Sequence, residues 1–192
     1  MAAVPVSPPN YFSALGVKRR FGQNKADLES RFYRLSRELH PDRFATGSAD
    51  ERRQALEKMS LVNEAYGALK DPVRLRDYFL KLVGVGGDAK AQIPVELAES
   101  WFELQEVLME DPVEGQQKVE AFKAELLDLK EKKQQDIQAL ETGIDCKLDE
   151  TSDDVAAAMP LFQKLATLVR DLNYLDSMER DVERIRGKRN VG

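Results

Sequence analysis

Apolar residues recur every three or four positions along most of the chain, which is the spacing of one face of an α-helix. The first such stretch begins after Asn24, a good N-cap, and ends before Pro41. A second runs from Ser48 to Asp71, and Pro72 starts a short third one. No stretch alternates apolar and polar residues as a half-buried strand does, so the pattern predicts an all-α protein.

The same spacing predicts which residues are buried. In the first two long helices we expect the following core residues: Leu28, Phe32, Leu35 and Leu39, then Leu56, Met59, Asn63, Tyr66 and Leu69. Three further helices are expected over about 95–110, 113–142 and 153–187, packed as an antiparallel three-helix bundle. Pro160 interrupts the last pattern, so that helix either kinks at Pro160 or begins there.

Charge and glycine content divide the chain. Residues 1–90 carry 16 Lys and Arg against 11 Asp and Glu, whereas the remainder carries 13 against 23. The change of sign coincides with Gly84-Val85-Gly86-Gly87, where a domain boundary is expected. We therefore predict the following organisation: a disordered N-terminus over 1–10, a helical domain over 11–83, a linker over 84–92 and a helical bundle over 93–192.

Composition excludes several classes of protein. One cysteine and one histidine among 192 residues leave no internal disulfide framework and no Cys- or His-rich metal site. No apolar run is long enough to span a membrane, and the first ten residues lack the features of a secretory signal. No nucleophile–base pair is recognisable either. These features predict a cytoplasmic protein that is not an enzyme, needs no cofactor and binds neither membranes nor nucleic acid.

His40-Pro41-Asp42 lies between the first two long helices, and its surroundings make the tripeptide informative. The whole region resembles a J-domain on four matching segments: Tyr-Phe-Ser-Ala-Leu-Gly-Val at 11–17, Phe32-x-x-Leu35, His40-Pro41-Asp42-Arg43-Phe44, and Asn63-Glu64-Ala65-Tyr66-x-x-Leu69-x-Asp71-Pro72. J-domains activate the ATPase of seventy-kilodalton heat-shock chaperones. The resemblance implies an antiparallel helical hairpin with short flanking helices, ahead of the C-terminal bundle.

The full chain is similar to the HscB (Jac-type) co-chaperones of iron–sulfur cluster assembly. The similarity is carried by Asp42-Arg43-Phe44-Ala45, by Trp101-Phe102-Glu103-Leu104-Gln105-Glu106 and by Leu172-Asn173-Tyr174-Leu175-Asp176. It implies two partners, an HscA-type chaperone ATPase and the cluster scaffold protein IscU. The chain departs from most J-domains at Glu29, Tyr33 and Glu38, where basic residues are common.

The resemblance also implies which residues bind each partner. We expect six residues to contact the chaperone: His40, Pro41, Asp42, Arg31, Arg34 and Arg37. The three arginines recur every three residues, so the alternative is that they are only a solvated helix face.

Four residues are expected to receive the scaffold: Phe102, Glu103, Glu106 and Tyr174. Phe102 and Met109 are seven residues apart and have no obvious place in the core. The alternative is that Phe102 and Tyr174 only fill the bundle. Ala98 and Glu99 stand where relatives have bulky apolar residues, so this surface is expected to be smaller here.

Two other functions fit the sequence. The J-domain-like region is compatible with a client other than the scaffold, and a helical adapter protein with an accidental His-Pro-Asp is a further alternative. Capture of the scaffold protein separates the first alternative from the HscB-like function. Salt-dependent binding to DNA or RNA would support the second alternative.

Overall fold

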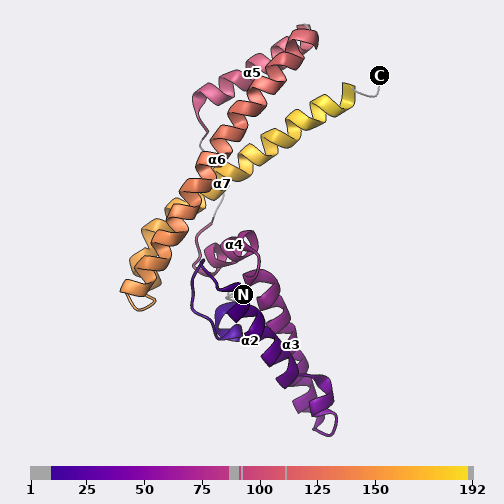
Figure 1. Cartoon of the computed structure of the whole chain (residues 1–192), viewed down its shortest axis with the longest axis vertical. Coiled ribbons are helices and arrows are strands. Elements are labelled where there is room, and N and C mark those ends of the chain that lie inside the picture. Colours follow the sequence, from indigo (N-terminus) through magenta and orange to yellow (C-terminus); the bar gives the residue numbers. More distant parts are fainter. Residues whose placement is uncertain (1–9, 87–90, 92, 111, 190–192) are drawn as a thin grey trace, which may run out of the picture. The chain divides into compact units, whose positions relative to one another are not determined.

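The computed structural model describes residues 10–86, 91, 93–110 and 112–189, and within these residues it contains helices and no strand (Figure 1). The predicted all-α class is therefore confirmed. In chain order the elements are α1 (Tyr11–Leu15), α2 (Lys25–Glu38), the 3₁₀ helix η1 (Pro41–Phe44), α3 (Ala49–Leu69), α4 (Pro72–Leu82), α5 (Val95–Glu110), α6 (Pro112–Glu150) and α7 (Val155–Arg189). No helix in this described part of the chain is long and apolar enough to cross a membrane.

The chain forms two compact units, and each unit is built from two separate stretches of the sequence. Unit 1 comprises Met1–Gly86 together with Glu141–Phe162, and unit 2 comprises Gly87–Leu140 together with Gln163–Gly192. Thus α6 and α7 each contribute to both units. The expected disordered segment falls mainly on residues 1–9, and the expected linker mainly on 87–90 and 92, all of which lie outside the described residues. Asn10, the last residue of the first segment, caps α1.

The helices of unit 1 begin where the sequence provides caps. The side chain of Asn24 accepts a hydrogen bond from the Asp27 amide at the start of α2. At the start of α3, Ser48 and Glu51 form the reciprocal capping box that their spacing predicts. Asp71 caps α4 and Pro72 is its first residue. These local signals therefore fix the helix starts.

The buried face of α3 agrees only in part with the prediction: Leu69 is buried, and Met59 and Tyr66 are partly buried, as expected. Leu56 is 57% exposed and Asn63 is also exposed. The other buried residues of α3 are Ala55, Val62 and Ala65, which the sequence did not predict. Both α1 and α2 pack against α3, and alanines in the contact allow neighbouring backbones to approach closely. A pattern that counts only large apolar residues misses a face built partly from alanine.

A cluster of aromatic rings joins the N-terminal helices to the start of α7. Phe79 of α4 is fully buried, and its ring centroid lies 5.0 Å from those of both Phe12 and Phe162. Phe21, in the segment between α1 and α2, lies 4.9 Å from Phe79. Edge-on and tilted contacts of this kind are favourable beyond the area that they bury. Phe162 is therefore part of the core of unit 1.

The turn between α6 and α7 is held by two arginines of the segment before α2. Ser152 and Asp153 adopt positive φ angles of 53° and 69°, a conformation that costs a residue other than glycine about 1–3 kcal/mol. Arg19 donates a hydrogen bond to the Asp153 carbonyl at 2.7 Å. Arg20, only 8% exposed, pairs with the carboxylates of Asp149 and Asp153. These contacts offset the strain of the turn.

Asp145 of α6 provides a further link to the same segment. Its carboxylate accepts hydrogen bonds from the backbone amides of Phe21 at 2.8 Å and Gly22 at 2.7 Å. Burial raises the pKa of Asp145, and the two amide donors partly oppose that shift. Asp149 shows the opposite behaviour, because its hydrogen bond with Arg20 lowers the pKa of its carboxyl group.

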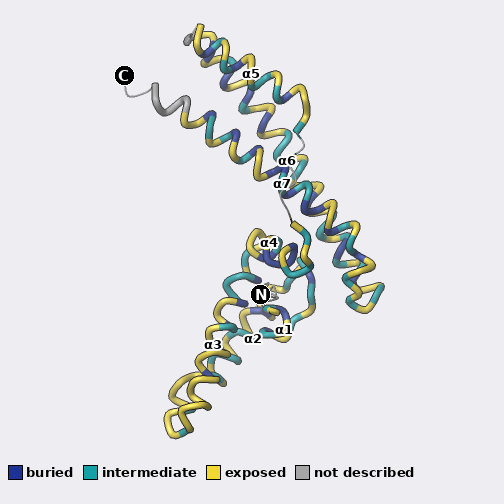
Figure 2. Tube along the Cα trace, turned by 180° about the vertical axis from the view of Figure 1, so that it is seen from behind, coloured by how far each residue is buried: buried dark blue, intermediate teal, exposed yellow. Residues whose placement is uncertain are grey.

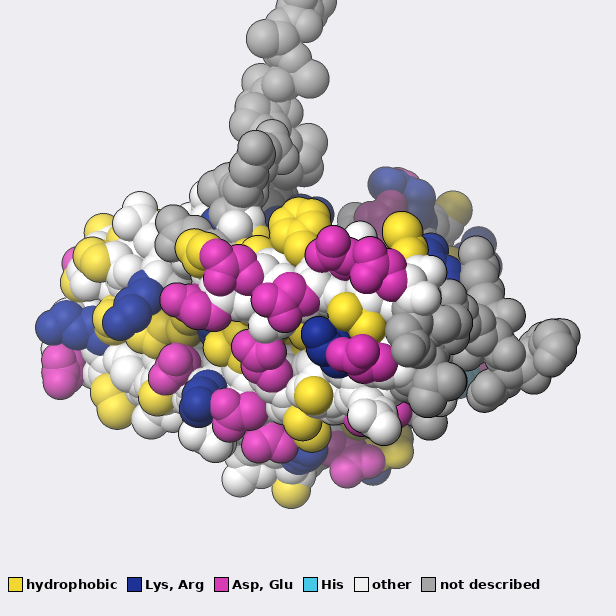
Figure 3. Space-filling view, turned by 90° about the horizontal axis from the view of Figure 1, so that it is seen from above, with side chains coloured by type: hydrophobic (Ala, Val, Ile, Leu, Met, Phe, Trp, Pro, Cys, Tyr) yellow, Lys and Arg dark blue, Asp and Glu magenta, His cyan; other side chains and the backbone are white. Residues whose placement is uncertain are grey.

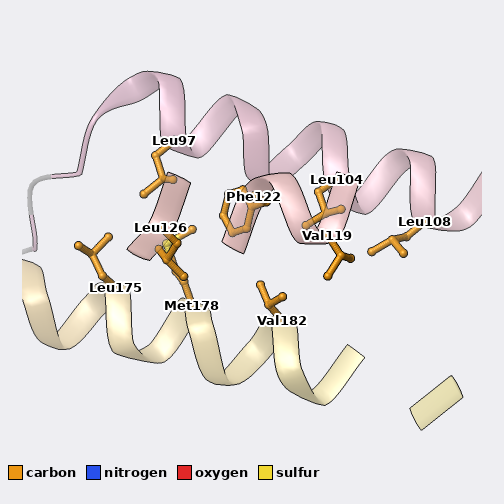
Figure 4. Close-up of a cluster of buried hydrophobic side chains, with 9 residues drawn as sticks. All are labelled: Leu97, Leu104, Leu108, Val119, Phe122, Leu126, Leu175, Met178 and Val182. Carbon is orange, nitrogen blue, oxygen red and sulfur yellow. The ribbon is translucent and has the colours of Figure 1, made fainter. Parts of the chain in front are cut away.

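Unit 2 has its own hydrophobic core between α5, α6 and α7. Figure 4 shows leucines of α5 directed toward α6 and α7. The cluster consists of Leu97, Leu104, Leu108, Val119, Phe122, Leu126, Leu175, Met178 and Val182. Trp101 is half-buried and packs on Phe122 with 5.4 Å between ring centroids. The predicted three-helix packing is thus confirmed.

Lysines of α6 pair with acidic residues of α7 along unit 2. Lys123 pairs with Glu183, and Lys130 pairs with Asp176 at 2.6 Å. Moving seven residues forward along α6 therefore moves seven residues back along α7, as two antiparallel helices require. Burial acts to lower the pKa of Lys130, but its acidic partners outweigh burial and the pKa is raised. These pairs therefore cross the antiparallel contact between the two helices.

Two helix boundaries differ from the sequence expectation. α6 was expected to end at about residue 142 but continues to Glu150, so Cys146 lies exposed on this helix. α7 begins at Val155, five residues before Pro160. Pro160 therefore does not mark the helix start.

Candidate functional site

The loop between α2 and α3 presents His40, Pro41 and Asp42 to solvent. Pro41 is the first residue of η1, where its fixed φ angle suits a helical start and its missing amide hydrogen leaves no bond unmade. The side chain of Asp42 is 89% exposed and that of His40 is 59% exposed. The loop therefore offers a carboxylate and an imidazole to a partner.

His40 also organises the loop. Its Nδ1 accepts a hydrogen bond from the Asp42 amide at 3.3 Å, so the imidazole acts as the N-cap of η1. Asp42 Oδ2 lies 3.4 Å from the same Nδ1 atom. The side chains of His40 and Asp42 thus lie next to each other, and the loop is shaped by contacts between residues close in sequence.

The three arginines predicted to contact the chaperone differ in their surroundings. Arg31 donates to the Gly16 carbonyl at 2.6 Å and to Asp27 at 2.8 Å, so it links the end of α1 to α2. Arg34 and Arg37 are exposed, and Arg34 lies 3.5 Å from Glu38. Arg31 therefore makes contacts within the chain, whereas Arg34 and Arg37 lie on the surface near the loop.

An open depression of about 680 Å³ lies beside the loop. It is lined by Tyr33, Ser36, Arg37 and His40. Tyr33 is 56% exposed and lies against Phe32, with 5.5 Å between the ring centroids. In the sequence, Tyr33 stands out only because most J-domains have a basic residue at that position. Its exposure and its position beside His40 place it at the candidate chaperone surface.

The residues predicted to receive the scaffold lie on the surface of unit 2. Phe102 is 69% exposed and Tyr174 is 43% exposed. Glu103 and Glu106 are exposed on the same helix as Phe102. Figure 3 shows a face of the molecule on which acidic side chains gather around exposed hydrophobic ones. The structure thus opposes the alternative that these two aromatic residues only fill the bundle.

One group of charged residues has no counterpart among the sequence-predicted sites. Arg20, Asp145, Asp149 and Asp153 come together although more than 120 positions separate the arginine from the aspartates. Asp145 and Asp149 lie one helical turn apart near the end of α6, and Asp153 lies in the turn that follows α6. Only the fold brings Arg20 to them. Among the described residues, no group of three His, Cys, Asp or Glu is arranged to hold a metal ion.

Comparison with known proteins bears on both units. Residues 10–78 match the family model of the DnaJ domain. The co-chaperone protein HscB of Proteus mirabilis is 42% identical over 76 residues, which are 40% of this chain and 44% of that protein. A co-chaperone protein HscB homolog of Vibrio cholerae is 39% identical over 83 residues, 43% of this chain and 48% of that protein. The matches span less than half the length of these curated relatives.

Solved structures extend the likeness over the rest of the chain. Chaperone HscB from Vibrio cholerae has a TM-score of 0.50 at 27% identity, covering 94% of this chain and 99% of that one. Human co-chaperone protein HscB has a TM-score of 0.53 at 20% identity, covering 95% and 85%, and shows the fold alone. Residues 10–78 thus resemble a DnaJ domain, and the predicted resemblance to HscB co-chaperones is confirmed.

Proposed function

We propose that this chain is a co-chaperone of iron–sulfur cluster assembly. Its DnaJ domain stimulates the ATPase of an HscA-type chaperone, and its α5–α7 bundle delivers the cluster scaffold protein IscU to that chaperone. The observation that carries this proposal is the exposed His40-Pro41-Asp42 loop within a DnaJ domain.

The chain acts by binding rather than by catalysis. The exposed Asp42 carboxylate accepts charge-assisted hydrogen bonds from a cationic group of the chaperone, each worth about 1.5–3 kcal/mol. A ligand shifts a conformational equilibrium only by its difference in affinity for the two states. The loop therefore binds most tightly to the state of the chaperone that hydrolyses ATP, and so raises its population.

Basic residues beside the loop increase the rate of encounter. Arg34 and Arg37 are exposed on α2 next to the depression that Tyr33 and His40 line. Positive charge around a binding loop speeds association with an acidic surface, and this effect on the association rate weakens as salt is added. Arg31 contributes indirectly, because it holds α2 to the end of α1.

The scaffold occupies the acidic outer surface of α5. Phe102 is the central apolar contact, Tyr174 of α7 adds a second, and Glu103 and Glu106 pair with basic groups. Exposed aromatic residues surrounded by charge are typical anchors of protein interfaces. The scaffold carries the cluster, so the chain itself needs no cofactor, and we expect it to act in the cytoplasm.

Single-turnover ATP hydrolysis by the chaperone tests the proposal. The full chain should accelerate hydrolysis alone, and the scaffold should add to that acceleration because the chain brings both partners together. Acceleration by the chain without any further effect of the scaffold would support a J-domain protein with a different client. Ala98 and Glu99 on α5 favour that second candidate, since they make the apolar surface smaller. No acceleration at all contradicts the co-chaperone function.

A further inference from the structure

Three exposed hydrophobic residues follow one line along α5. Val95 is 67% exposed, Phe102 is 69% exposed and Met109 is 84% exposed. They are spaced seven residues apart, almost two helical turns, so each lies above the last with a drift of only about 20°. At about 1.5 Å per residue the line is about 21 Å long. Figure 2 shows exposed and buried positions alternating along this helix.

The line is separate from the core of unit 2. Leu97, Leu104 and Leu108 are at most 6% exposed and point toward α6 and α7 in Figure 4. Nothing in the packing of the bundle requires large apolar side chains on the opposite side of α5. Helices of soluble proteins normally place charged residues there. Three large apolar side chains aligned on the outer face indicate a surface that is covered by a partner.

Charge defines the partner further. The sequence of α5 contains five glutamates and no Lys or Arg. Glu99 follows Val95 by four residues and Glu106 follows Phe102 by four, so both carboxylates run beside the apolar line. A second copy of this chain would bring the same glutamates into contact and be repelled. A partner with an apolar strip and basic residues along one side of it is complementary.

We infer that the scaffold docks along the whole outer edge of α5, with Val95 and Met109 as further specificity-determining contacts on either side of Phe102. The inference rests on the proposed function and extends it. Phe102 alone would make a small contact, whereas three aligned apolar residues would orient the partner along the axis of α5. The partner surface is accordingly an apolar strip about three to four helical turns long, flanked by Lys or Arg.

Calorimetric titration of the full chain with the purified scaffold protein tests this inference. Val95→Ser and Met109→Ser should each weaken binding by about tenfold, because each removes an apolar side chain that the complex buries. Leu127→Ser is the matched control, since Leu127 is 54% exposed on α6 and should leave affinity unchanged. Glu99→Gln should reduce the loss of affinity that added salt causes in the native complex.

The possible outcomes separate the inference from the function on which it rests. If Phe102→Ala weakens binding while Val95→Ser and Met109→Ser do not, the extended surface is wrong and the proposed function stands. If the native chain does not bind the scaffold, the delivery function and the inference both fail. If sedimentation instead shows a dimer of this chain that Met109→Ser dissociates, the occupant is a second copy and the inference is overturned.

Discussion

The two candidate recognition surfaces differ in construction from the junction between the N-terminal helices and the α6–α7 turn. Asp42 and Phe102 have highly exposed side chains, and the loop around Asp42 is shaped by contacts within a few residues. Phe79 and Arg20 are buried and meet residues from a distant part of the sequence. The first type of site is arranged for a partner, and the second holds the chain together.

This difference has a consequence for mutation. Removing an exposed side chain takes nothing from the core, so it should change binding and leave stability almost unchanged. Removing a buried aromatic residue leaves a cavity and destabilises the fold by several kcal/mol. Partner binding and stability can therefore be altered separately in this protein.

The largest effect is expected at the loop. His40→Gln and Asp42→Asn should each abolish stimulation of the chaperone ATPase while the circular dichroism spectrum and melting temperature stay nearly unchanged. The reason is that both side chains are exposed and have only local contacts. Asp50→Asn, an exposed residue in the first turn of α3, is the control and should retain stimulation. Full stimulation by Asp42→Asn, or loss of the fold, would contradict the assignment.

The next largest effect is expected at the junction. Phe162→Ala should lower the free energy of unfolding of unit 1 by about 3–5 kcal/mol, because it removes a fully buried ring beside Phe79. Chemical denaturation followed by circular dichroism measures the change. Fluorescence of Trp101, the only tryptophan of the chain, reports unit 2 separately and should change less. Phe102→Ala is the same substitution at an exposed site and should cost almost nothing.

A related test concerns the fragment that ends at Gly84. It lacks Glu141–Phe162, so Phe79 loses its contact with Phe162 and Arg76 loses its pair with Glu141. We expect the fragment to stimulate the chaperone weakly and to unfold at a lower urea concentration than unit 1 of the full chain. Equal stability of the two would show that this junction contributes little.

A smaller effect is expected at the scaffold surface. Phe102→Ala combined with Tyr174→Ala should weaken scaffold binding by more than about 2 kcal/mol if these residues are central anchors. The melting curve should be unchanged because both side chains are exposed. Titration calorimetry of the double variant beside Leu127→Ala measures the difference. Native affinity in the folded double variant would place the docking surface elsewhere.

The smallest effect concerns pH. Arg20 lowers the pKa of Asp149 in the folded chain, so this pair stabilises the fold above the ordinary aspartate value of 3.8 and is lost as the pH falls below it. Asp149→Asn should therefore unfold at lower urea than the native chain at pH 7, and the difference should shrink below about pH 4. Asp136→Asn, an exposed position on α6, controls for the loss of charge. A difference that stays constant down to pH 3 would rule out this pair as its source.

Sequence patterns predicted the parts of the fold that depend on neighbouring residues. Asn24, the Ser48–Glu51 pair and Pro72 mark helix starts because capping and the geometry of proline are local effects. The helix expected over about 95–110 was also correctly predicted from apolar spacing. The buried side of α3 was predicted only in part, since whether alanine lies inside depends on which helix approaches it.

The sequence by itself determined the helical class, the helix starts, the His40-Pro41-Asp42 loop and the glutamates of α5. Each of these follows from residue type and short spacing. Only the tertiary structure decided that Arg31 is tied to Gly16, that Arg20 meets Asp149 and Asp153, and that Phe162 belongs to the core of unit 1. The physical reason is distance along the chain. Arg31 and Gly16 lie 15 positions apart, and Arg20 lies more than 120 positions from Asp149 and Asp153. Such contacts depend on how helices pack, and no local pattern encodes that packing.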